Sequence, residues 1–284
     1  MNEVTVTSEK VTSERPRRSR SLSLVAFLFG VADVDELPGL ALVQLLGELG
    51  MSTSAARGLL ARMRSDGQLA TSRRGREVDY RMAGPFAATF RRLRDGGSRG
   101  LPSWEGHFHA LVYQMPEEHR AYRDRLRRIA QLVGYGQLQP GILIAARDVA
   151  GEMAGVLAAA PTGVRVHRAT LGFPTETAAE IARSTWELDA LADTFRGHCT
   201  TLSAALVDST PPPPTTDTLR TLARIVNDAA VDLIDDPRLP GALLPAGWPV
   251  AELGVLFERV NARFGPPAAQ HVHAVIAVRS GSGR

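Results

Sequence analysis

Two helical patterns joined by a short glycine-containing turn, with a basic hairpin directly after them, constrain this chain more than any other feature. The first pattern covers 37–49 and is followed by Gly50, a residue typical of the position just after a helix. Its expected apolar stripe consists of Leu40, Val43, Leu46 and Leu49. The second pattern begins at a capping hydroxyl, Ser52 or Thr53, and runs to about Ser65. Helix, turn and helix at this spacing predict a helix-turn-helix unit.

The second of these helices is expected to have one apolar and one polar face. Apolar side chains recur at the helical spacing in Ala56, Leu59, Leu60 and Met63. The opposite face carries Thr53, Ser54, Arg57, Ala61 and Arg64. Arginine can bond guanine edges, hydroxyls can bond bases or phosphates, and a small residue lets a helix lie close to DNA. A surface helix with solvated arginines is the alternative interpretation.

The segment 69–82 predicts two short strands with a turn at Arg74-Gly75. Such a hairpin holds its arginines where they can reach phosphates or a minor groove. From Ser52 to Arg81 there are seven arginines and three acidic residues, a local net charge of +4. A helix-turn-helix followed by a basic hairpin is a winged helix. The predicted contacts to double-stranded DNA are Ser52, Thr53, Ser54, Arg57, Arg62, Arg64, Arg73, Arg74 and Arg76.

The charge distribution agrees with a nucleic-acid partner for the front of the chain. The first 99 of the 284 residues carry 16 basic and 11 acidic side chains, and the remainder carries 17 and 19. The net charge is therefore +5 in front and −2 behind. The single cysteine, Cys199, excludes an internal disulfide, and no apolar stretch has the roughly 20 residues that a membrane span needs. We expect a cytoplasmic protein without membrane contact.

One feature near the N-terminus has an alternative interpretation. Basic residues from Arg15 to Arg20 precede the apolar run Leu22–Ala32, which resembles the start of a secretory signal. No small-residue cleavage site follows, and the run continues a helical pattern, Leu22–Gly30, that the winged helix needs. The secreted alternative would be recognised by a mature chain that begins near Asp33.

Beyond a linker at 96–102, the residues from Trp104 to Leu171 predict the order β-α-β-β-α-β, a split βαβ or ferredoxin-like arrangement. Helical patterns follow at 175–206, 219–234 and 250–264. The expected fold class is thus α+β: an N-terminal winged helix-turn-helix, a middle ferredoxin-like domain and a mainly helical C-terminal domain. The predicted domains are a disordered basic arm 1–20, a winged helix 21–95, a dimerisation or spacer domain 103–173, an effector or dimerisation domain 174–270 and a tail 271–284.

Residues that could carry catalysis or bind a metal are few. His107 and His109, like His271 and His273, form HxH pairs that would share a strand face, but the spacing supplies no dependable third ligand. We therefore predict no metal site. Cys199 follows His198, but neighbours in a helix point apart. No nucleophile elbow, phosphate loop or zinc-protease motif is present, so we predict no catalytic residues and no cofactor.

The chain resembles the family of phenylacetic-acid catabolon repressors (PaaX). In the winged helix the resemblance is carried by Ser52–Arg57, Leu60, Gly67–Leu69, Arg73–Arg76 and Tyr80–Met82. Further along it is carried by Trp104, Met115–Glu118, Gly134-Tyr135, Leu138–Ile142, Trp186–Ala192 and Asp236–Pro240. The resemblance implies a homodimeric repressor that reads an inverted-repeat operator and is released by a small metabolite such as an acyl-CoA.

Two departures bear on what the resemblance implies. The family's middle domain is similar to a small CRISPR nuclease that needs an acidic residue at the end of its first strand, where this chain has Gln114, with Glu117 beyond a proline. In addition, 226–234 replaces a segment that is usually aromatic and arginine-rich, so the effector can differ from the usual aryl-CoA. A nucleic-acid processing or RNA-binding factor that uses the ferredoxin-like domain is the alternative function. The operon, the effector pocket and the direction of regulation are not determined by the sequence.

Overall fold

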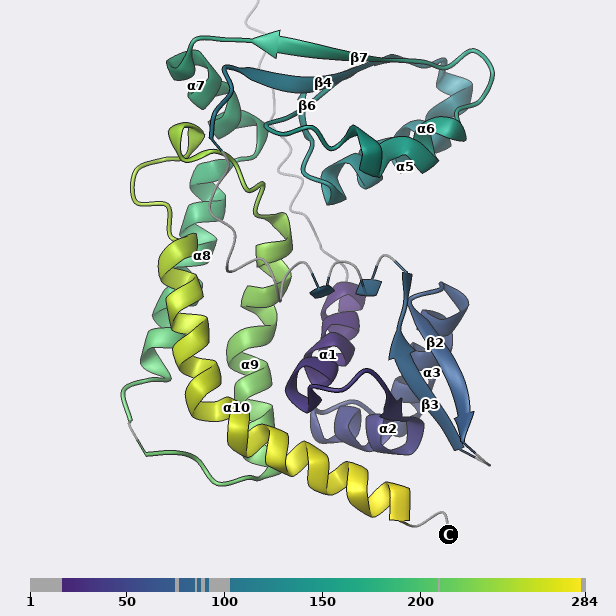
Figure 1. Ribbon diagram of the computed structural model, residues 1–284, viewed down its shortest axis with the longest axis vertical. Helices are drawn as coiled ribbons and strands as arrows, with labels where there is room; N and C mark the ends of the chain where they lie inside the picture. The colour runs from purple at the N-terminus through teal and green to yellow at the C-terminus, as the bar shows by residue number, and fades with distance from the viewer. Residues whose placement is uncertain are drawn as a thin grey trace, which may run out of the picture.

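The computed structural model describes residues 17–74, 77–84, 86–87, 90–91, 103–208 and 210–281. Helices and two small antiparallel sheets make up an α+β structure, as predicted. In Figure 1 the larger sheet lies at one end of the molecule and the N-terminal part at the other, with long helices beside both. Among the described residues, no helix is both long and apolar enough to cross a membrane.

The N-terminal part is a winged helix, which confirms the prediction. Its elements are α1 (Arg17–Ala32), β1 (Leu37–Pro38), α2 (Gly39–Glu48), α3 (Thr53–Ser65), β2 (Leu69–Arg74) and β3 (Glu77–Met82). The strands form an antiparallel sheet in the order β1-β3-β2. Helix α1 begins at Arg17, inside the segment 1–20 predicted to be an arm, and residues 1–16 lie outside the described part. The apolar run Leu22–Ala32 belongs to α1, with Val25, Leu28 and Phe29 buried in the core.

The buried face of α2 differs from the predicted stripe. Ala41, Leu42, Leu45 and Leu46 are buried, whereas Leu40 is 52% exposed. Apolar residues occur on all sides of this helix, so periodicity alone could not identify the side that faces α1 and α3. The end of α2 is as predicted: Gly50 has φ +93°, and the Met51 N–H donates to the carbonyl of Leu46 at 3.0 Å.

The middle part has the predicted βαββαβ order. It contains β4 (His107–Gln114), η2 (Glu117–His119), α5 (Arg120–Leu132), β5 (Gly136–Gln139), β6 (Ile142–Ala145), η3 (Ala150–Met153), α6 (Ala154–Ala158) and β7 (Arg165–Gly172). The strand order β5-β6-β4-β7, antiparallel throughout, is that of a ferredoxin-like sheet. Leu111 on one face packs with Leu126 of α5 and Met153 beside α6. Phe108 on the other face packs with the C-terminal part.

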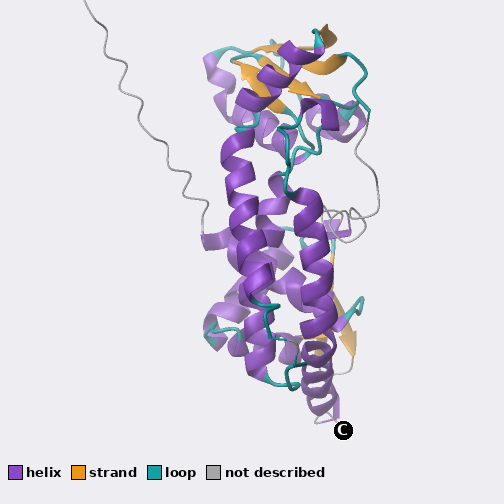
Figure 2. Ribbon diagram, turned by 90° about the vertical axis from the view of Figure 1, so that its left-hand side faces the viewer, coloured by secondary structure: helices purple, strands orange, loops and turns teal. Residues whose placement is uncertain are grey.

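The C-terminal part is helical, with α7 (Thr175–Thr185), α8 (Leu188–Ala204), α9 (Thr216–Asp232), η4 (Leu233–Asp235), η5 (Gly241–Leu243) and α10 (Val250–Gly281). The helix predicted over 175–206 is interrupted at Glu187, whose φ of +48° ends α7 and starts α8 in a new direction. Figure 2 shows the long helices running between the two ends of the molecule.

The prediction of a tail at 271–284 is wrong for the described residues, because α10 continues to Gly281. Proline usually ends a helix, since it lacks an N–H and its ring clashes with the preceding turn. Here Pro266 and Pro267 lie inside α10, which changes direction part-way along its length (Figure 1). The second half is held by tertiary packing, because Ala268 and Val272 are fully buried against the winged helix.

The winged helix and the C-terminal helices share one hydrophobic core. Leu28 of α1, Leu45 of α2, Leu222 of α9 and Val260 of α10 belong to the same buried cluster. The predicted boundaries divide these segments along the sequence, but the folded chain brings them together. A movement of α9 or α10 therefore acts directly on the helices that support α3.

Candidate nucleic-acid interface

The N-terminus of α3 is fixed by a side-chain cap. The Ser52 hydroxyl accepts a hydrogen bond from the Ala55 N–H at 3.2 Å and lies 3.2 Å from the Ser54 hydroxyl. Ser52 thus acts first as the cap residue, which stabilises the helix start. Thr53 and Ser54 follow it on the exposed first turn. In helix-turn-helix proteins these first residues of the recognition helix reach base edges.

The body of α3 separates a buried face from a basic one. Ala56, Leu59, Leu60 and Met63 are buried, as predicted. Arg57, Arg62 and Arg64 are exposed, and none of them forms an ion pair with an acidic residue that the structure describes. Their guanidinium groups are available for a polyanion.

The three arginines do not share one side of α3. At about 100° per residue, Arg57 and Arg64 differ by only about 20° around the helix, whereas Arg62 is about 140° from Arg57. The Arg62 guanidinium lies over Gly58, one turn earlier, 3.6 Å from where a Cβ would stand. Arg57 and Arg64 therefore form the predicted reading side with Thr53 and Ser54, and Arg62 lies on its flank.

The wing is slightly longer than predicted. The register pairs Arg74 with Glu77, so Arg74, which was predicted to lie in the turn, belongs to β2. Arg73 is exposed on β2 opposite Val78. The Arg74 side chain and all of Arg76 lie outside the described residues.

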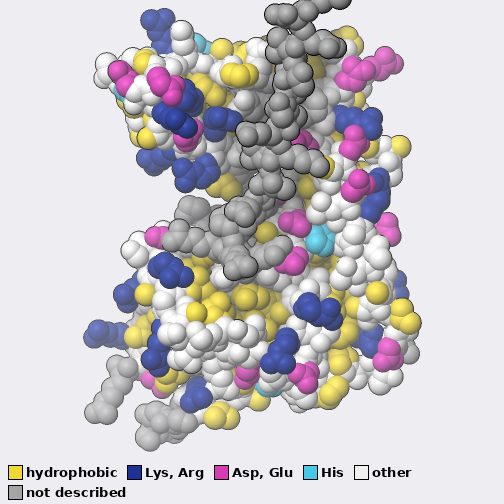
Figure 3. All heavy atoms as spheres, turned by 180° about the vertical axis from the view of Figure 1, so that it is seen from behind, with side chains coloured by type: hydrophobic (Ala, Val, Ile, Leu, Met, Phe, Trp, Pro, Cys, Tyr) yellow, Lys and Arg dark blue, Asp and Glu magenta, His cyan; other side chains and the backbone are white. Residues whose placement is uncertain are grey.

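One further arginine of the wing is exposed, on the face of the hairpin opposite to that of Arg73. Arg81 is exposed on β3 opposite Ala70, and the sequence-based site did not include it. The signal available was its place in the second strand of a basic hairpin. Figure 3 shows arginine side chains spread over the end of the molecule where the winged helix lies. Of the acidic residues between 52 and 81, Asp79 is buried, so its carboxylate is withdrawn from the surface.

Gln114 and Glu117 lie at and just beyond the end of β4, where a nuclease of the related type would need a metal-binding carboxylate. Gln114 is exposed at the end of β4, as predicted. The Glu117 carboxylate accepts two hydrogen bonds from Arg123, at 3.0 and 3.2 Å. These bonds and the Arg123 charge hold the pKa of Glu117 below its ordinary value. The carboxylate nearest the strand end is therefore held in an ion pair.

The histidines that sequence analysis singled out fall in separate environments. His271 and His273 lie in α10 and not on a strand, which corrects their predicted placement. The His273 ring is 2.8 Å from the carbonyl of Ala32. His198 is 2.8 Å from the Asp232 carboxylate, while Cys199 is buried, and burial raises the pKa of its thiol. His107 and His109 do share one face of β4.

A cavity of about 330 Å³ lies where the middle part meets the C-terminal part. Its wall includes the end of α5, the start of β5, the α7–α8 junction and the segment 233–238. Two buried polar atoms of lining residues have no hydrogen-bond partner: Gln137 Oε1 and Trp186 Nε1. Burying such atoms unpaired costs free energy. Leu233 and Ile234, at the end of the segment that departs from the family pattern, also line this cavity.

Known protein families match the chain in the same three parts that the structure shows. The model of the PaaX-like protein matches residues 20–85, that of the PaaX protein central Cas2-like domain matches 101–181, and that of the PaaX-like protein C-terminal domain matches 186–274. A search of curated proteins finds no match. Among solved structures, the uncharacterized protein Rv0674 from Mycobacterium tuberculosis is similar over 90% of this chain and 98% of that chain, at 24% identity and a TM-score of 0.58. That similarity concerns the fold alone.

The three family matches follow one another along most of the sequence, and the chain belongs to the PaaX-like family of transcriptional regulators.

Proposed function

We propose that this protein is a sequence-specific DNA-binding repressor whose α3 enters the major groove of an operator. The observation that carries the proposal is the composition of one side of α3. Its capped first turn exposes Thr53 and Ser54, and Arg57 and Arg64 continue that side without an acidic partner among the described residues. Backbone and hydroxyl groups at such a helix start bind phosphates, and arginine recognises guanine.

The wing supplies a second, sequence-independent contact. Arg73 on β2 extends the basic surface beyond α3, and Arg81 on β3 adds an exposed arginine on the other face of the same hairpin. Because phosphate contacts fix the register of a protein on DNA, the wing orients α3 without reading bases. Two copies of the chain related by a two-fold axis would read an inverted repeat with half-sites about one helical turn apart.

The experiment that tests this function is a footprint of the purified protein on fragments of its own genome at near-physiological salt. A protected inverted repeat near a promoter supports the proposal. Uniform binding that disappears as salt rises, or no binding, contradicts it, because counterion release dominates non-specific affinity. Cleavage or modification of the probe would favour the processing-factor alternative.

We further propose that a small metabolite, with an acyl-CoA as the first candidate, relieves repression from the cavity at the α7–α8 junction. A volume of about 330 Å³ suits the acyl part of such a ligand, with the nucleotide outside. Leu233 and Ile234 supply apolar wall, and Arg147 and Arg238 supply positive charge beside Glu187, Asp235 and Asp236.

The ligand would affect DNA binding through the hydrophobic core that the winged helix shares with the C-terminal helices. The cavity is lined by the end of the α9–η4 segment, and α9 packs on α1 of the winged helix. A ligand that shifts this segment changes the support of α3, and by linkage DNA must then weaken ligand binding by the same factor. Titrating a panel of acyl-CoA thioesters against the protein–operator complex tests this: release by at least one thioester is expected, and equal operator affinity with all of them contradicts it.

A further inference from the structure

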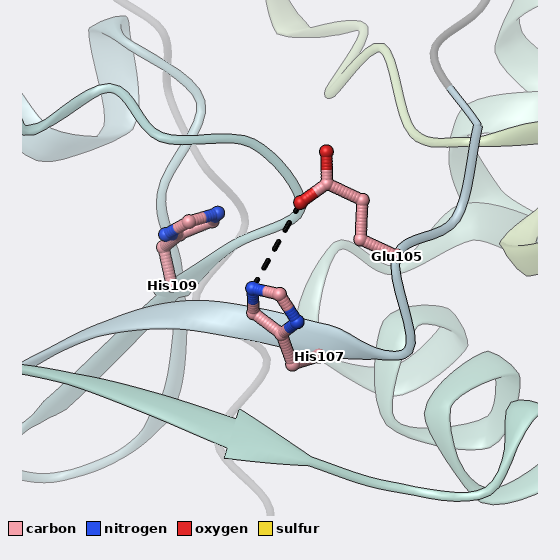
Figure 4. Close-up of side chains that lie close together, drawn as sticks. All are labelled: Glu105, His107 and His109. Atoms are coloured by element: carbon pink, nitrogen blue, oxygen red, sulfur yellow. Dashed lines mark ion pairs between the residues drawn. The ribbon is translucent and has the colours of Figure 1, made fainter.

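The turn into β4 gathers three side chains that could hold a metal ion. One ligand atom from each of Glu105, His107 and His109 lies within 4.8 Å of the others. Figure 4 shows the carboxylate directed toward the two rings. No other group of three such side chains occurs in the part of the chain that the structure describes. The spacing of the HxH pair in the sequence did not identify Glu105 as a third ligand.

The backbone accounts for this convergence. Residues two apart on a strand point to the same face, so His107 and His109 project together, with ring centroids 5.1 Å apart. Phe108 between them points the other way and is fully buried, which anchors the strand. Gly106 has φ +83°, a conformation that favours glycine, and this turn brings Glu105 back over the strand face. Its carboxylate lies 3.9 Å from His107 Nε2.

The pairing of β4 with β7 keeps the two rings in place. His107 lies opposite Gly172, which has no side chain to crowd the ring, and His109 lies opposite Thr170. The Phe173 N–H donates to the carbonyl of Gly106 at 3.4 Å, which ties the turn to the end of β7. Both histidines therefore stand on a paired strand, whereas the Glu105 side chain is 63% exposed and free to rotate toward them.

The surroundings leave room for solvent ligands. A hollow of about 300 Å³ opens beside His109, lined also by Asp148 and Arg168. Asp148 already accepts hydrogen bonds from the Ala150 N–H at 2.9 Å and from Arg168 at 3.1 Å. It is therefore an outer neighbour of the three-residue cluster, beside a hollow that could hold water ligands.

The donor set selects the class of metal. Two imidazoles and one carboxylate suit Zn²⁺, Ni²⁺ or Cu²⁺, whereas Mg²⁺ and Ca²⁺ prefer oxygen ligands throughout. In a tetrahedral zinc site with bonds near 2.1 Å, ligand atoms lie about 3.4 Å apart. Rotations of the Glu105 side chain and of the two imidazole rings would close the present separations, which are within 4.8 Å, to that value. The other close histidine–carboxylate pairs among the described residues, His119–Glu118, His198–Asp232 and His271–Glu48, supply only two ligands each.

We propose that Glu105, His107 and His109 bind one divalent transition-metal ion, with Zn²⁺ as the physiological candidate and water completing its coordination. The ion would join the turn that enters the middle part to the β4–β7 pair. This site is separate from the DNA-reading surface, so the proposal does not depend on the repressor function.

The test is zinc binding to the metal-free full-length protein, measured by isothermal titration calorimetry with ZnCl₂ in a non-chelating buffer. The expected result is one Zn²⁺ per chain at this site, with no binding of Mg²⁺ at the same concentrations. The double variant His107→Ala, His109→Ala should lose this ion. Glu105→Gln should weaken binding roughly 10-fold or more, because it removes a charged ligand. The matched control, His167→Ala, removes an exposed histidine of β7 in the same sheet and should bind as the unchanged protein does.

Two further measurements keep the result interpretable. Circular dichroism melting without metal checks the fold of each variant, and Glu105→Gln alone suffices if the double variant does not fold, since this side chain is exposed. Co²⁺ substituted for Zn²⁺ should give visible absorption bands with nitrogen ligands that the double variant lacks. Absence of zinc uptake by the unchanged protein, or equal uptake by a folded double variant or by Glu105→Gln, overturns the proposal.

Discussion

His271 of α10 lies 2.6 Å from the carboxylate of Glu48 at the end of α2, and this contact joins two segments more than two hundred positions apart. Both side chains are 17% exposed. Thr216 at the start of α9 donates to the same carboxylate at 3.2 Å, and Arg220 donates to the Glu48 backbone carbonyl at 3.0 Å. Helix α2, which precedes α3, is therefore held from two C-terminal helices at once.

This contact predicts how stability depends on pH. Burial by itself would raise the pKa of Glu48, but hydrogen bonds with His271, Gln44 and Thr216 and the His271 charge together lower it below the ordinary 4.5. A carboxyl whose pKa is lower in the folded state stabilises the protein above its unfolded pKa and loses that contribution as pH falls through the folded value. Glu48→Gln should therefore reduce the unfolding free energy at neutral pH by about 1–3 kcal/mol, which lowers Tm. Its stability should also fall less steeply than that of the unchanged protein as pH drops below 4.5. Thermal melts across pH measure this, with the exposed Glu258→Gln as control; parallel pH profiles for Glu48→Gln and the unchanged protein would contradict it.

The second half of α10 should stabilise the winged helix. Val272 is fully buried in the shared core, whereas Val255 on the same helix is 57% exposed. Val272→Ala should cost about 1.5–3 kcal/mol through lost apolar burial, and Val255→Ala should cost little. Urea unfolding compares the two variants. Equal midpoints would mean that 271–281 does not contribute to the folded core.

Two glycines of α2 should respond to alanine in opposite ways. A Cβ on Gly39 would lie 2.8 Å from the carbonyl oxygen of Val78, while a Cβ on Gly47 meets nothing within 4 Å. Gly39→Ala should separate α2 from β3 and lower Tm. Gly47→Ala, in an exposed helical position, should raise stability by up to about 1 kcal/mol because alanine favours the helix. Thermal melts and far-ultraviolet circular dichroism distinguish them; an unchanged Tm for Gly39→Ala would indicate that α2 does not approach β3 this closely.

Arginines of the reading surface should differ in the kind of affinity they provide. Arg57→Ala should cost about 1–3 kcal/mol of operator binding and relax specificity at one base position, because it removes a base contact. Arg73→Ala and Arg62→Ala should weaken binding to all sequences, and each should reduce the salt slope by about 1, as expected for phosphate contacts. Fluorescence anisotropy with operator and mutated duplexes at several salt concentrations measures both effects.

The control for these variants is Arg259→Ala, an exposed arginine of α10. It should leave affinity and salt slope unchanged. If Arg57→Ala behaves like Arg259→Ala on the operator, the assignment of the reading side of α3 is wrong.

Local pattern was sufficient for most of the secondary structure and for the order of the three parts. The four apolar positions of α3, the Gly50 helix end and the βαββαβ order are all present as predicted, because each depends on neighbours within a few residues or on one period. The predictions that were wrong include the apolar stripe of α2, where apolar residues on every side left the buried face open, the unbroken helix over 175–206, and the tail at 271–284, which is a continuation of α10 as far as Gly281.

What the sequence by itself determined is therefore the set of elements and the arginine-bearing helix and hairpin that they present. Only the tertiary structure decided that α10 continues past its prolines to pack on the winged helix, that Glu48 meets His271, and that a glycine turn carries Glu105 to His107 and His109. The physical reason is the range of the interactions. Capping and periodicity act within one or two helical turns, whereas burial in a shared core and the meeting of distant side chains depend on how separate segments pack together.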